Sequence, residues 1–155
     1  MPRTAARRPL NFPSLDQVMP DVDRLLEGHS TVGKWNLAQI CKHLTIVLTG
    51  AVDGFDVKVP WFVKLVAPLI FRRILKTRSM PEGLKASEAV LPRPGLDPRA
   101  EVEALRAAVR LFLAHTGPFP ANPFVRRMSR EAIEQFQCIH CAHHLSFALP
   151  DAPRA

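Results

Sequence analysis

The sequence predicts an all-α protein built as a four-helix bundle. Four stretches of roughly 14 to 21 residues repeat apolar side chains at steps of three and four, which is the spacing of one face of a helix. No stretch shows sustained alternation of apolar and polar residues, and tyrosine is absent. Because each helix must bury its apolar stripe against another element, we expect the four helices to pack into one bundle.

The composition fits one globular domain. The chain has 155 residues, of which 47% are hydrophobic and 23% are charged, and this is enough to bury a sizeable core. The fifteen prolines cluster between the periodic stretches, in connections rather than in helix interiors. We expect a helical domain over residues 14–150, a flexible N-terminal tail over 1–13 and a C-terminal tail over 151–155.

The first two helices are expected in the N-terminal third of the chain. The first begins after Ser14, a residue type that favours the N-cap, and stops before Gly28. Its apolar stripe is Leu15, Val18, Met19, Val22, Leu25 and Leu26. The second runs from about Asn36 to about Val52. Its stripe is Leu37, Ile40, Leu44, Val47 and Ala51.

The other two helices are expected in the C-terminal third. The third begins at Pro98, a good first-turn residue, with Asp97 as its N-cap. Its apolar face is Val102, Leu105, Val109 and Phe112. The fourth starts at Ser129 and runs to about Leu149, because Pro150 cannot continue a helix.

Residues 53–97 are too long for a simple connection between core helices 2 and 3. We expect a short extra helix over 61–75, kinked or broken at Pro68, followed by an irregular proline-rich loop over 79–95. Such an insert forms a lid or binding wall, packs across the bundle without chemistry, or lies on a membrane surface. Of the last two interpretations, we favour packing across the bundle.

The net charge of +7 is distributed along the chain. The main basic groups are Arg3, Arg7, Arg8, Arg72, Arg73, Lys76, Arg78, Arg126, Arg127 and Arg130. Aromatic residues are not interleaved with these cations, and no zinc-finger or RNP-like motif is present, so we expect no nucleic-acid partner. The most apolar stretch, 59–75, contains Lys64, Pro68, Arg72 and Arg73. It is too short and too charged to cross a bilayer, and we expect no membrane partner.

The three cysteines favour a reducing compartment. An odd count excludes a complete disulfide framework, and the basic start of the chain is not followed by an apolar signal segment. We therefore expect a soluble, cytoplasmic protein. Cys138 and Cys141 form a CxxC motif, but a redox pair of this kind belongs at a helix N-terminus in a βαβ setting. Buried or interhelical thiols are the favoured interpretation.

Residues 138–144 read Cys-Ile-His-Cys-Ala-His-His and suggest a metal site. At 100° per residue, the buried stripe of the last helix is expected to be Ile133, Phe136 and Phe147. His140 and His144 lie within about 60° of its centre and one turn apart, as two ligands of one ion do. His143 lies at the edge of this stripe and is a candidate to orient a ligand. Cys138 and Cys141 point about 100° or more away from the stripe centre.

A third ligand is expected from another helix. His43 lies among apolar residues of the second helix, and a buried imidazole needs a polar partner. Three imidazoles can share a divalent cation such as zinc, nickel or iron(II), with one position left for water or substrate. Two alternatives stay open. The histidines are singly hydrogen-bonded, or Cys41 and Cys141 supply sulfur ligands because the helix phase is shifted.

Two motifs carry a family resemblance. Residues 35–44 read Trp-Asn-Leu-Ala-Gln-Ile-Cys-Lys-His-Leu, and residues 136–145 read Phe-Gln-Cys-Ile-His-Cys-Ala-His-His-Leu. They resemble the DinB/YfiT-like metal-binding four-helix-bundle family, and most closely a bacterial branch whose function is uncharacterised. That family has a Trp at the start of its second helix, a His about eight residues later and HxxxH on the last core helix. The resemblance spans residues 15–147, but only these two motifs are specific.

The resemblance implies that His43, His140 and His144 are metal ligands and that zinc or nickel is bound. It also implies frequent homodimers and a small-molecule substrate, because relatives transfer low-molecular-weight thiols or are described as metal-dependent hydrolases. Thiol-transfer members often continue with Arg-Gly-Gln after the last His, whereas this chain continues with Leu145-Ser-Phe. We therefore expect a metal-dependent hydrolase or thiol S-transferase. The alternative is a non-catalytic interaction module whose metal is structural or absent.

Overall fold

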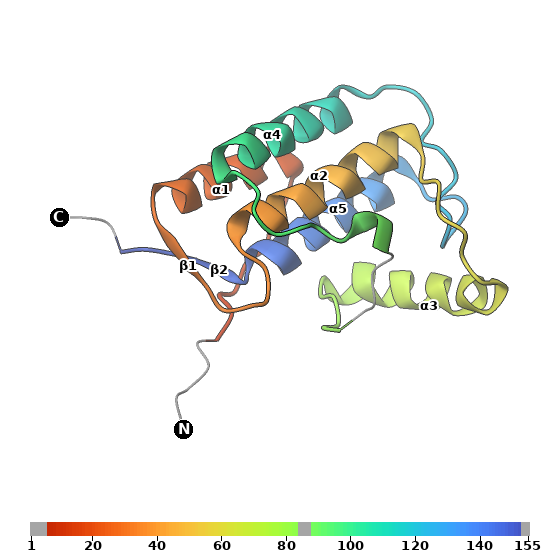
Figure 1. Cartoon of the computed structure of the whole chain (residues 1–155). Coiled ribbons are helices and arrows are strands. Elements are labelled where there is room, and N and C mark those ends of the chain that lie inside the picture. The colour runs from red at the N-terminus through yellow and green to blue at the C-terminus, as the bar shows by residue number, and fades with distance from the viewer. Residues whose placement is uncertain (1–5, 84–87, 153–155) are drawn as a thin grey trace.

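A computed structural model describes residues 6–83 and 88–152, and the predictions for residues 1–5, 84–87 and 153–155 lie outside it. The described chain is mostly helical (Figure 1). Its helices are α1 (Val18–Glu27), α2 (Leu37–Asp53), α3 (Trp61–Thr77), α4 (Pro98–Ala114) and α5 (Arg130–Leu145). Two 3-10 turns, η1 (Leu15–Gln17) and η2 (Glu88–Val90), and two short strands, β1 (His29–Thr31) and β2 (Ala148–Pro150), complete the elements.

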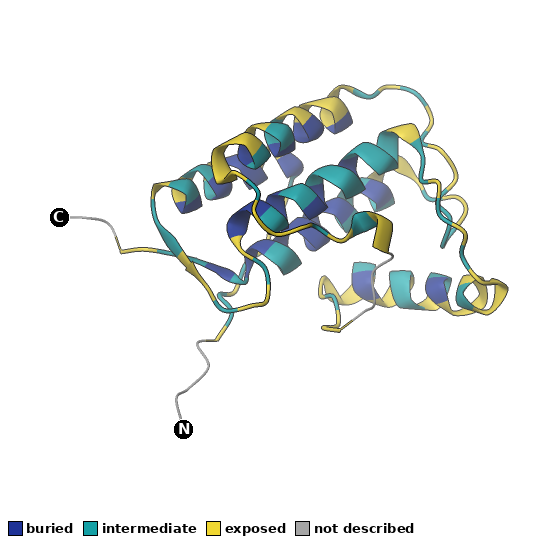
Figure 2. Ribbon diagram, viewed as in Figure 1, coloured by how far each residue is buried: buried dark blue, intermediate teal, exposed yellow. Residues whose placement is uncertain are grey.

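Four of these helices surround one hydrophobic core. α2 packs most extensively along α4, and α1 contacts both α4 and α5. The core is buried on the facing sides of these helices, whereas their outer sides are exposed (Figure 2). Its largest fully buried side chains are Leu15, Leu25, Leu37, Ile40, Leu44, Leu48, Leu105, Phe112 and Leu145. The apolar stripes predicted for the first three helices supply most of this core, as expected for amphipathic helices.

Side-chain caps fix the starts of three core helices. Asn36 and Gln39 form a capping box at α2, in which each side chain accepts from the backbone N–H of the other residue. Asp97 caps α4, as predicted, and Ser129, the predicted start of the last helix, is the N-cap of α5. Ser14 precedes the η1 turn, and its side chain makes no capping hydrogen bond, so that prediction was wrong in detail.

The prediction of a purely α-helical chain needs one correction. β1 and β2 pair antiparallel, with His29 opposite Pro150 and Thr31 opposite Ala148. The last helix therefore ends at Leu145 and not near Leu149, because the backbone after it pairs with the segment that follows α1. Strands of three residues are too short to show an alternating pattern, which explains why the sequence did not reveal them.

The inserted helix α3 is longer than predicted and continues through Pro68. Pro68 has no N–H to donate to the carbonyl of Lys64, four residues earlier, and Lys64 is an exposed residue. α3 lies against α5 at the edge of the molecule (Figure 1). Phe71 stacks on Phe136 with ring centroids 4.5 Å apart, and Gln135 donates a hydrogen bond to the carbonyl of Leu75. One side of α3 therefore packs as expected.

The segment before Ser14, which we predicted to be a tail, contacts the domain where it is described. Phe12 is buried in the hydrophobic core. The guanidinium of Arg8 donates to the carboxylate of Asp21 and to the carbonyls of Leu145 and Ala148. These carbonyls lie at the end of α5 and the start of β2, so Arg8 joins three separate parts of the chain. None of the helices in the described ranges is both long enough and apolar enough to cross a bilayer.

We predict that Leu105→Ala and Leu111→Ala, made on the same helix, differ strongly in their effect on stability. Leu105 is fully buried, so truncation leaves a cavity and lowers the free energy of unfolding by about 2–5 kcal/mol. Leu111 is 43% exposed, so its truncation changes that free energy by less than about 0.5 kcal/mol. Urea unfolding followed by circular dichroism measures both, and equal effects would contradict the core described above.

Candidate metal centre

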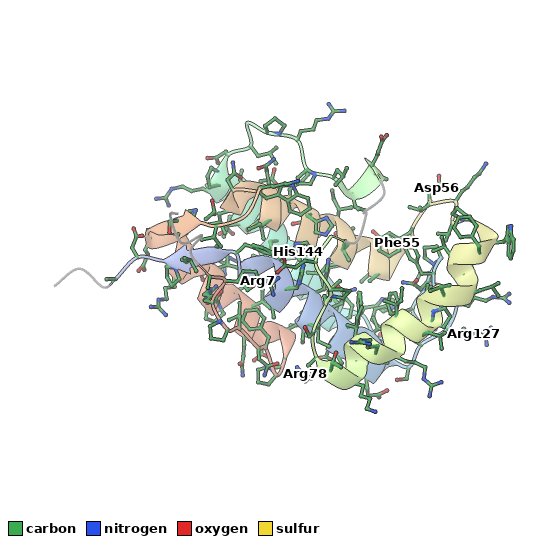
Figure 3. All side chains as sticks on the ribbon, turned by 90° about the horizontal axis from the view of Figure 1, so that it is seen from below. Arg7, Phe55, Asp56, Arg78, Arg127 and His144 are labelled. Atoms are coloured by element: carbon green, nitrogen blue, oxygen red, sulfur yellow. The ribbon has the colours of Figure 1, made fainter. Side chains whose placement is uncertain are left out.

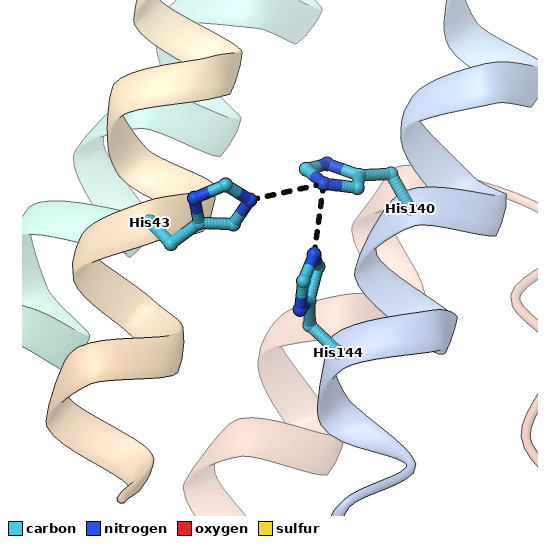
Figure 4. Close-up of side chains that lie close together, drawn as sticks. All are labelled: His43, His140 and His144. Atoms are coloured by element: carbon cyan, nitrogen blue, oxygen red, sulfur yellow. Dashed lines mark hydrogen bonds between the residues drawn. The ribbon is translucent and has the colours of Figure 1, made fainter. Parts of the chain in front are cut away.

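Three histidines from two helices meet at one point. His43 on α2 faces His140 and His144, which lie one turn apart on α5 (Figure 4). The Nε2 atom of His140 lies 3.1 Å from Nε2 of His43 and 3.0 Å from Nε2 of His144. One ligand atom from each ring can be chosen so that all lie within 4.8 Å of one another. The structure thus brings together the three residues that the sequence singled out.

The rings are removed from water. His43 and His140 are 4% and 5% exposed, and His144 is partly buried. Burial lowers the pKa of all three imidazoles below the usual value, and the neighbouring histidines lower the pKa values of His140 and His144 further. The neutral imidazole is therefore favoured, and this is the form that binds a metal ion.

Hydrogen bonds alone cannot satisfy this arrangement. Nδ1 of His43 lies 2.8 Å from the carbonyl oxygen of Val90 and must donate to it, because a carbonyl only accepts. Nε2 of the neutral His43 ring then carries a lone pair directed at His140. Nε2 of His140 is part of both short contacts, to His43 and to His144. One proton between these nitrogens can form a hydrogen bond in only one of the two contacts. Nδ1 of His140 is also buried and has no hydrogen-bond partner among the described residues.

A divalent cation fits this donor set. Zinc binds imidazole nitrogen at about 2.0–2.1 Å, which places the nitrogens of a tetrahedral site about 3.3 Å apart. The two short Nε2 separations, 3.0 Å and 3.1 Å, lie close to that spacing. Without an ion, the lone pairs of neighbouring imidazole nitrogens repel one another. With an ion bound between the rings, each lone pair would be directed at the ion. Neutral nitrogen ligands suit zinc, nickel, copper and iron better than magnesium or calcium. The three histidines can therefore hold a metal ion.

Aromatic rings and a carbonyl position the imidazoles. Trp35, just before α2, stacks on His144 with ring centroids 5.4 Å apart and lies 5.0 Å from the ring of His43. Phe136 stacks on His140 from one turn earlier on α5. The Val90 carbonyl comes from η2, so the proline-rich insert supplies one wall of the centre. The family motif includes Trp35 at the start of the second helix, but its contacts with two of the imidazoles could not be predicted from the sequence, and no local pattern indicated Val90.

His143 does not hydrogen bond to the other histidines. Its ring meets His144 edge to face at 4.9 Å, and its Nδ1 is buried without a hydrogen-bond partner in the described part of the chain. Burial, together with the nearby charge of Arg7, lowers the pKa of His143 to about 4. We predicted that His143 orients a metal ligand. Its contact with a predicted ligand is the ring packing against His144.

The cysteines lie on a different side of α5 from the histidines. Cys138, Cys141 and Cys41 all belong to the hydrophobic core and are free thiols. The sequence-based stripe of α5 was wrong in phase, because Phe136 is only partly buried whereas Cys138 and Cys141 are almost fully buried. The reason is that α5 has two covered sides, one against the hydrophobic core and one against α2 and α3. The three-histidine group contains no cysteine, so the sulfur-ligand alternative is not supported.

Asp53 and Asp56, at and beyond the end of α2, do not belong to the three-histidine group. Asp53 is ten residues after His43 on α2, which corresponds to about 15 Å along the helix. Asp56 lies beyond the end of α2, and both side chains are exposed. A cavity of about 510 Å³ opens instead between the end of α2, the loop before α5 and the start of α5. Phe136 lines this cavity and also stacks on His140, so its ring is in contact with both.

Together these features define a mostly helical protein with a small two-stranded sheet and a buried three-histidine group. The sequence matches the family described as a protein of unknown function, DUF1569, over residues 4–151. Since the match covers nearly the whole chain, the protein belongs to the DUF1569 family. No curated protein and no solved structure matches it.

We predict that the thiols of the folded protein are almost unreactive toward an aromatic disulfide reagent at neutral pH. Burial raises the pKa of Cys41 to about 12 and that of Cys138 to about 11, and it also raises the pKa of Cys141, so thiolate is scarce. Absorbance of the released thiolate measures the reaction, and the same protein in denaturant is the control, in which all cysteines react. A thiol that reacts rapidly in the native protein would contradict this burial.

Proposed function

We propose that this protein binds one divalent metal ion through His43, His140 and His144 and uses it to transform a small molecule. The observation that supports the proposal is the convergence of three buried Nε2 atoms, two of whose separations are 3.0 Å and 3.1 Å. Zinc or nickel is the preferred ion, and iron(II) is the next choice, because all three ligands are neutral imidazoles.

The reaction class we propose is hydrolysis or transfer of a thiol to an electrophile. An ion with three protein ligands keeps a position for water or a thiol and lowers the pKa of the group bound there. The resemblance of residues 35–44 and 136–145 to the DinB/YfiT-like proteins supports this class, and we propose that the core helices form the same kind of bundle. Leu145-Ser-Phe, in place of Arg-Gly-Gln, weakens the thiol-transfer version relative to the hydrolytic one.

The residues around the histidines have distinct roles in this proposal. The Val90 carbonyl holds His43 in the tautomer whose Nε2 is free to bind the ion. Trp35 and Phe136 cover His144 and His140 and exclude water from their faces. The cavity beside Phe136 is lined by Phe55, Phe119 and Met128 as well as Arg127, and its volume is in the range of small-molecule sites. It offers room for the body of a small substrate.

The second candidate function is a binding module in which the ion only joins α2 to α5. The observation that favours this second function is the burial of the three-histidine group below the protein surface. His43 and His140 are almost fully buried, and no described carboxylate belongs to the three-histidine group to act as a general base. The two functions differ in one measurable property, which is whether a coordination position of the bound ion is open to an added ligand.

We predict that the metal-free protein binds about one equivalent of zinc and that His43→Ala, His140→Ala and His144→Ala each weaken this binding. Each substitution removes a direct ligand, so affinity falls by more than the 10- to 100-fold typical of losing an outer-shell partner. Competition with a chromophoric chelator gives the affinities. His115→Ala, at the end of α4 and outside the group, is the matched control and leaves the affinity unchanged. Unaltered zinc binding by the His43→Ala, His140→Ala double variant would refute the site.

A second prediction distinguishes a catalytic from a structural ion. In the cobalt(II)-substituted protein, 2-mercaptoethanol adds a sulfur-to-cobalt charge-transfer band in the near-ultraviolet, because the three histidines leave one coordination position free. Titration followed by absorbance measures this band, and cobalt-loaded His144→Ala serves as a comparison with a damaged site. A spectrum that does not change with thiol, azide or cyanide would favour the structural role.

A further inference from the structure

The outward side of α3 carries a row of large apolar side chains. The exposed fractions are 74% for Trp61, 57% for Phe62, 66% for Leu65, 52% for Val66 and 66% for Leu69. At 100° per residue these positions fall within about 140° of one another on the helix surface. The side of α3 turned to the protein is different, since Ala67 and Ile74 are its buried residues. Exposed patches of this kind usually mark an interaction surface.

The same side of α3 becomes cationic toward its C-terminus. Arg72, Arg73 and Lys76 follow the apolar row, and all are exposed. By the same helical count they lie within the angular range of the apolar row. No Asp or Glu occurs between Val57 and Pro81, although this stretch also contains Lys58, Lys64 and Arg78. In Figure 3, Asp56 precedes one end of the helix and Arg78 follows its other end.

Against the expectation from the sequence that there is no membrane partner, we propose that this outward side of α3 binds the surface of an anionic lipid bilayer. The apolar residues Trp61 to Leu69 enter the boundary between headgroups and acyl chains, and Arg72, Arg73 and Lys76 contact lipid phosphates. A helix with Trp, Phe and Leu on one side and Lys and Arg beside them is typical of segments that lie in this interface without crossing it. The proposal is independent of the metal centre, since the three histidines lie on the opposite side of the α3–α5 contact.

Charge favours lipid over a second copy of the chain as the occupant. Two copies paired through parallel α3 helices would bring Arg72, Arg73 and Lys76 of both copies together, without a described carboxylate on α3 to pair with them. Antiparallel α3 helices would instead set these cations against the apolar row of the partner, where they lose water without gaining an opposite charge. An anionic bilayer supplies both an apolar phase and negative charge. The helix is also held in place for such contact, because the Phe71–Phe136 stack and the Gln135–Leu75 hydrogen bond tie it to α5.

The test is co-sedimentation of the full chain with vesicles. We expect binding to vesicles of phosphatidylcholine with about one quarter phosphatidylglycerol and little binding to pure phosphatidylcholine. Raising NaCl from about 0.1 M to about 0.5 M weakens binding, because screening shortens the reach of the charges. Trp61→Ser combined with Leu65→Ser lowers the partition coefficient at least about tenfold. Arg72→Gln combined with Lys76→Gln lowers it roughly 10- to 30-fold.

Matched controls come from α4. Leu111→Ser with Leu113→Ser removes exposed apolar area elsewhere, and Arg99→Gln with Arg110→Gln removes exposed charge elsewhere. Both double variants bind anionic vesicles like the unmodified chain, and circular dichroism verifies that every variant is folded. His43→Ala also binds vesicles normally, which separates this proposal from the metal centre.

Several results would overturn the proposal. These are absence of binding to anionic vesicles, equal binding to neutral vesicles, and normal binding by the Trp61→Ser, Leu65→Ser variant. Sedimentation velocity without lipid tests the second copy as occupant, and a dimer that this variant dissociates would assign the surface to self-association. Binding to poly-L-glutamate but not to vesicles would instead assign it to an acidic protein.

Discussion

The structure depends on a constraint at the contact between α2 and α5, where three neutral imidazoles are buried with their Nε2 atoms facing one another. A buried polar atom needs a partner, and one ring proton cannot serve both short contacts of His140. A shared cation would satisfy all three rings at once, and the three histidines could hold one. The Val90 carbonyl and the stacking of Trp35 on His144 have a common effect, because each contact restricts the orientation of an imidazole.

The two sides of α5 explain why one short helix supports both fold and site. Cys138, Cys141 and Leu145 complete the hydrophobic core, while His140 and Phe136 face the other way. The insert between α2 and α4 covers that second side, with η2 against His43 and α3 against Phe136. The insert is therefore a part of the site and not merely a long connection. Its remaining exposed side has no packing partner among the described residues, which leaves it free for a surface such as a membrane.

The helices whose apolar stripe faces a single core could be predicted from the sequence, and so could the one-turn spacing of His140 and His144. The cap Asp97 and the start of the last helix near Ser129 follow from local pattern, and the convergence of His43 with the last helix follows from helical geometry together with the family resemblance. Other features depend on contacts between distant segments. The pairing of β1 with β2, the burial of Phe12 and the Val90 hydrogen bond have no local signature. The phase of α5 was misjudged because a helix covered on two sides has no single stripe.

The most direct test of the central claim is anomalous X-ray diffraction from crystals of the zinc-loaded protein at the zinc absorption edge. The account predicts one strong anomalous peak between α2 and α5, at about 2.0–2.1 Å from Nε2 of His43, His140 and His144. A peak bound by cysteine sulfur, a peak at another place, or no peak in protein that retains stoichiometric zinc would contradict it.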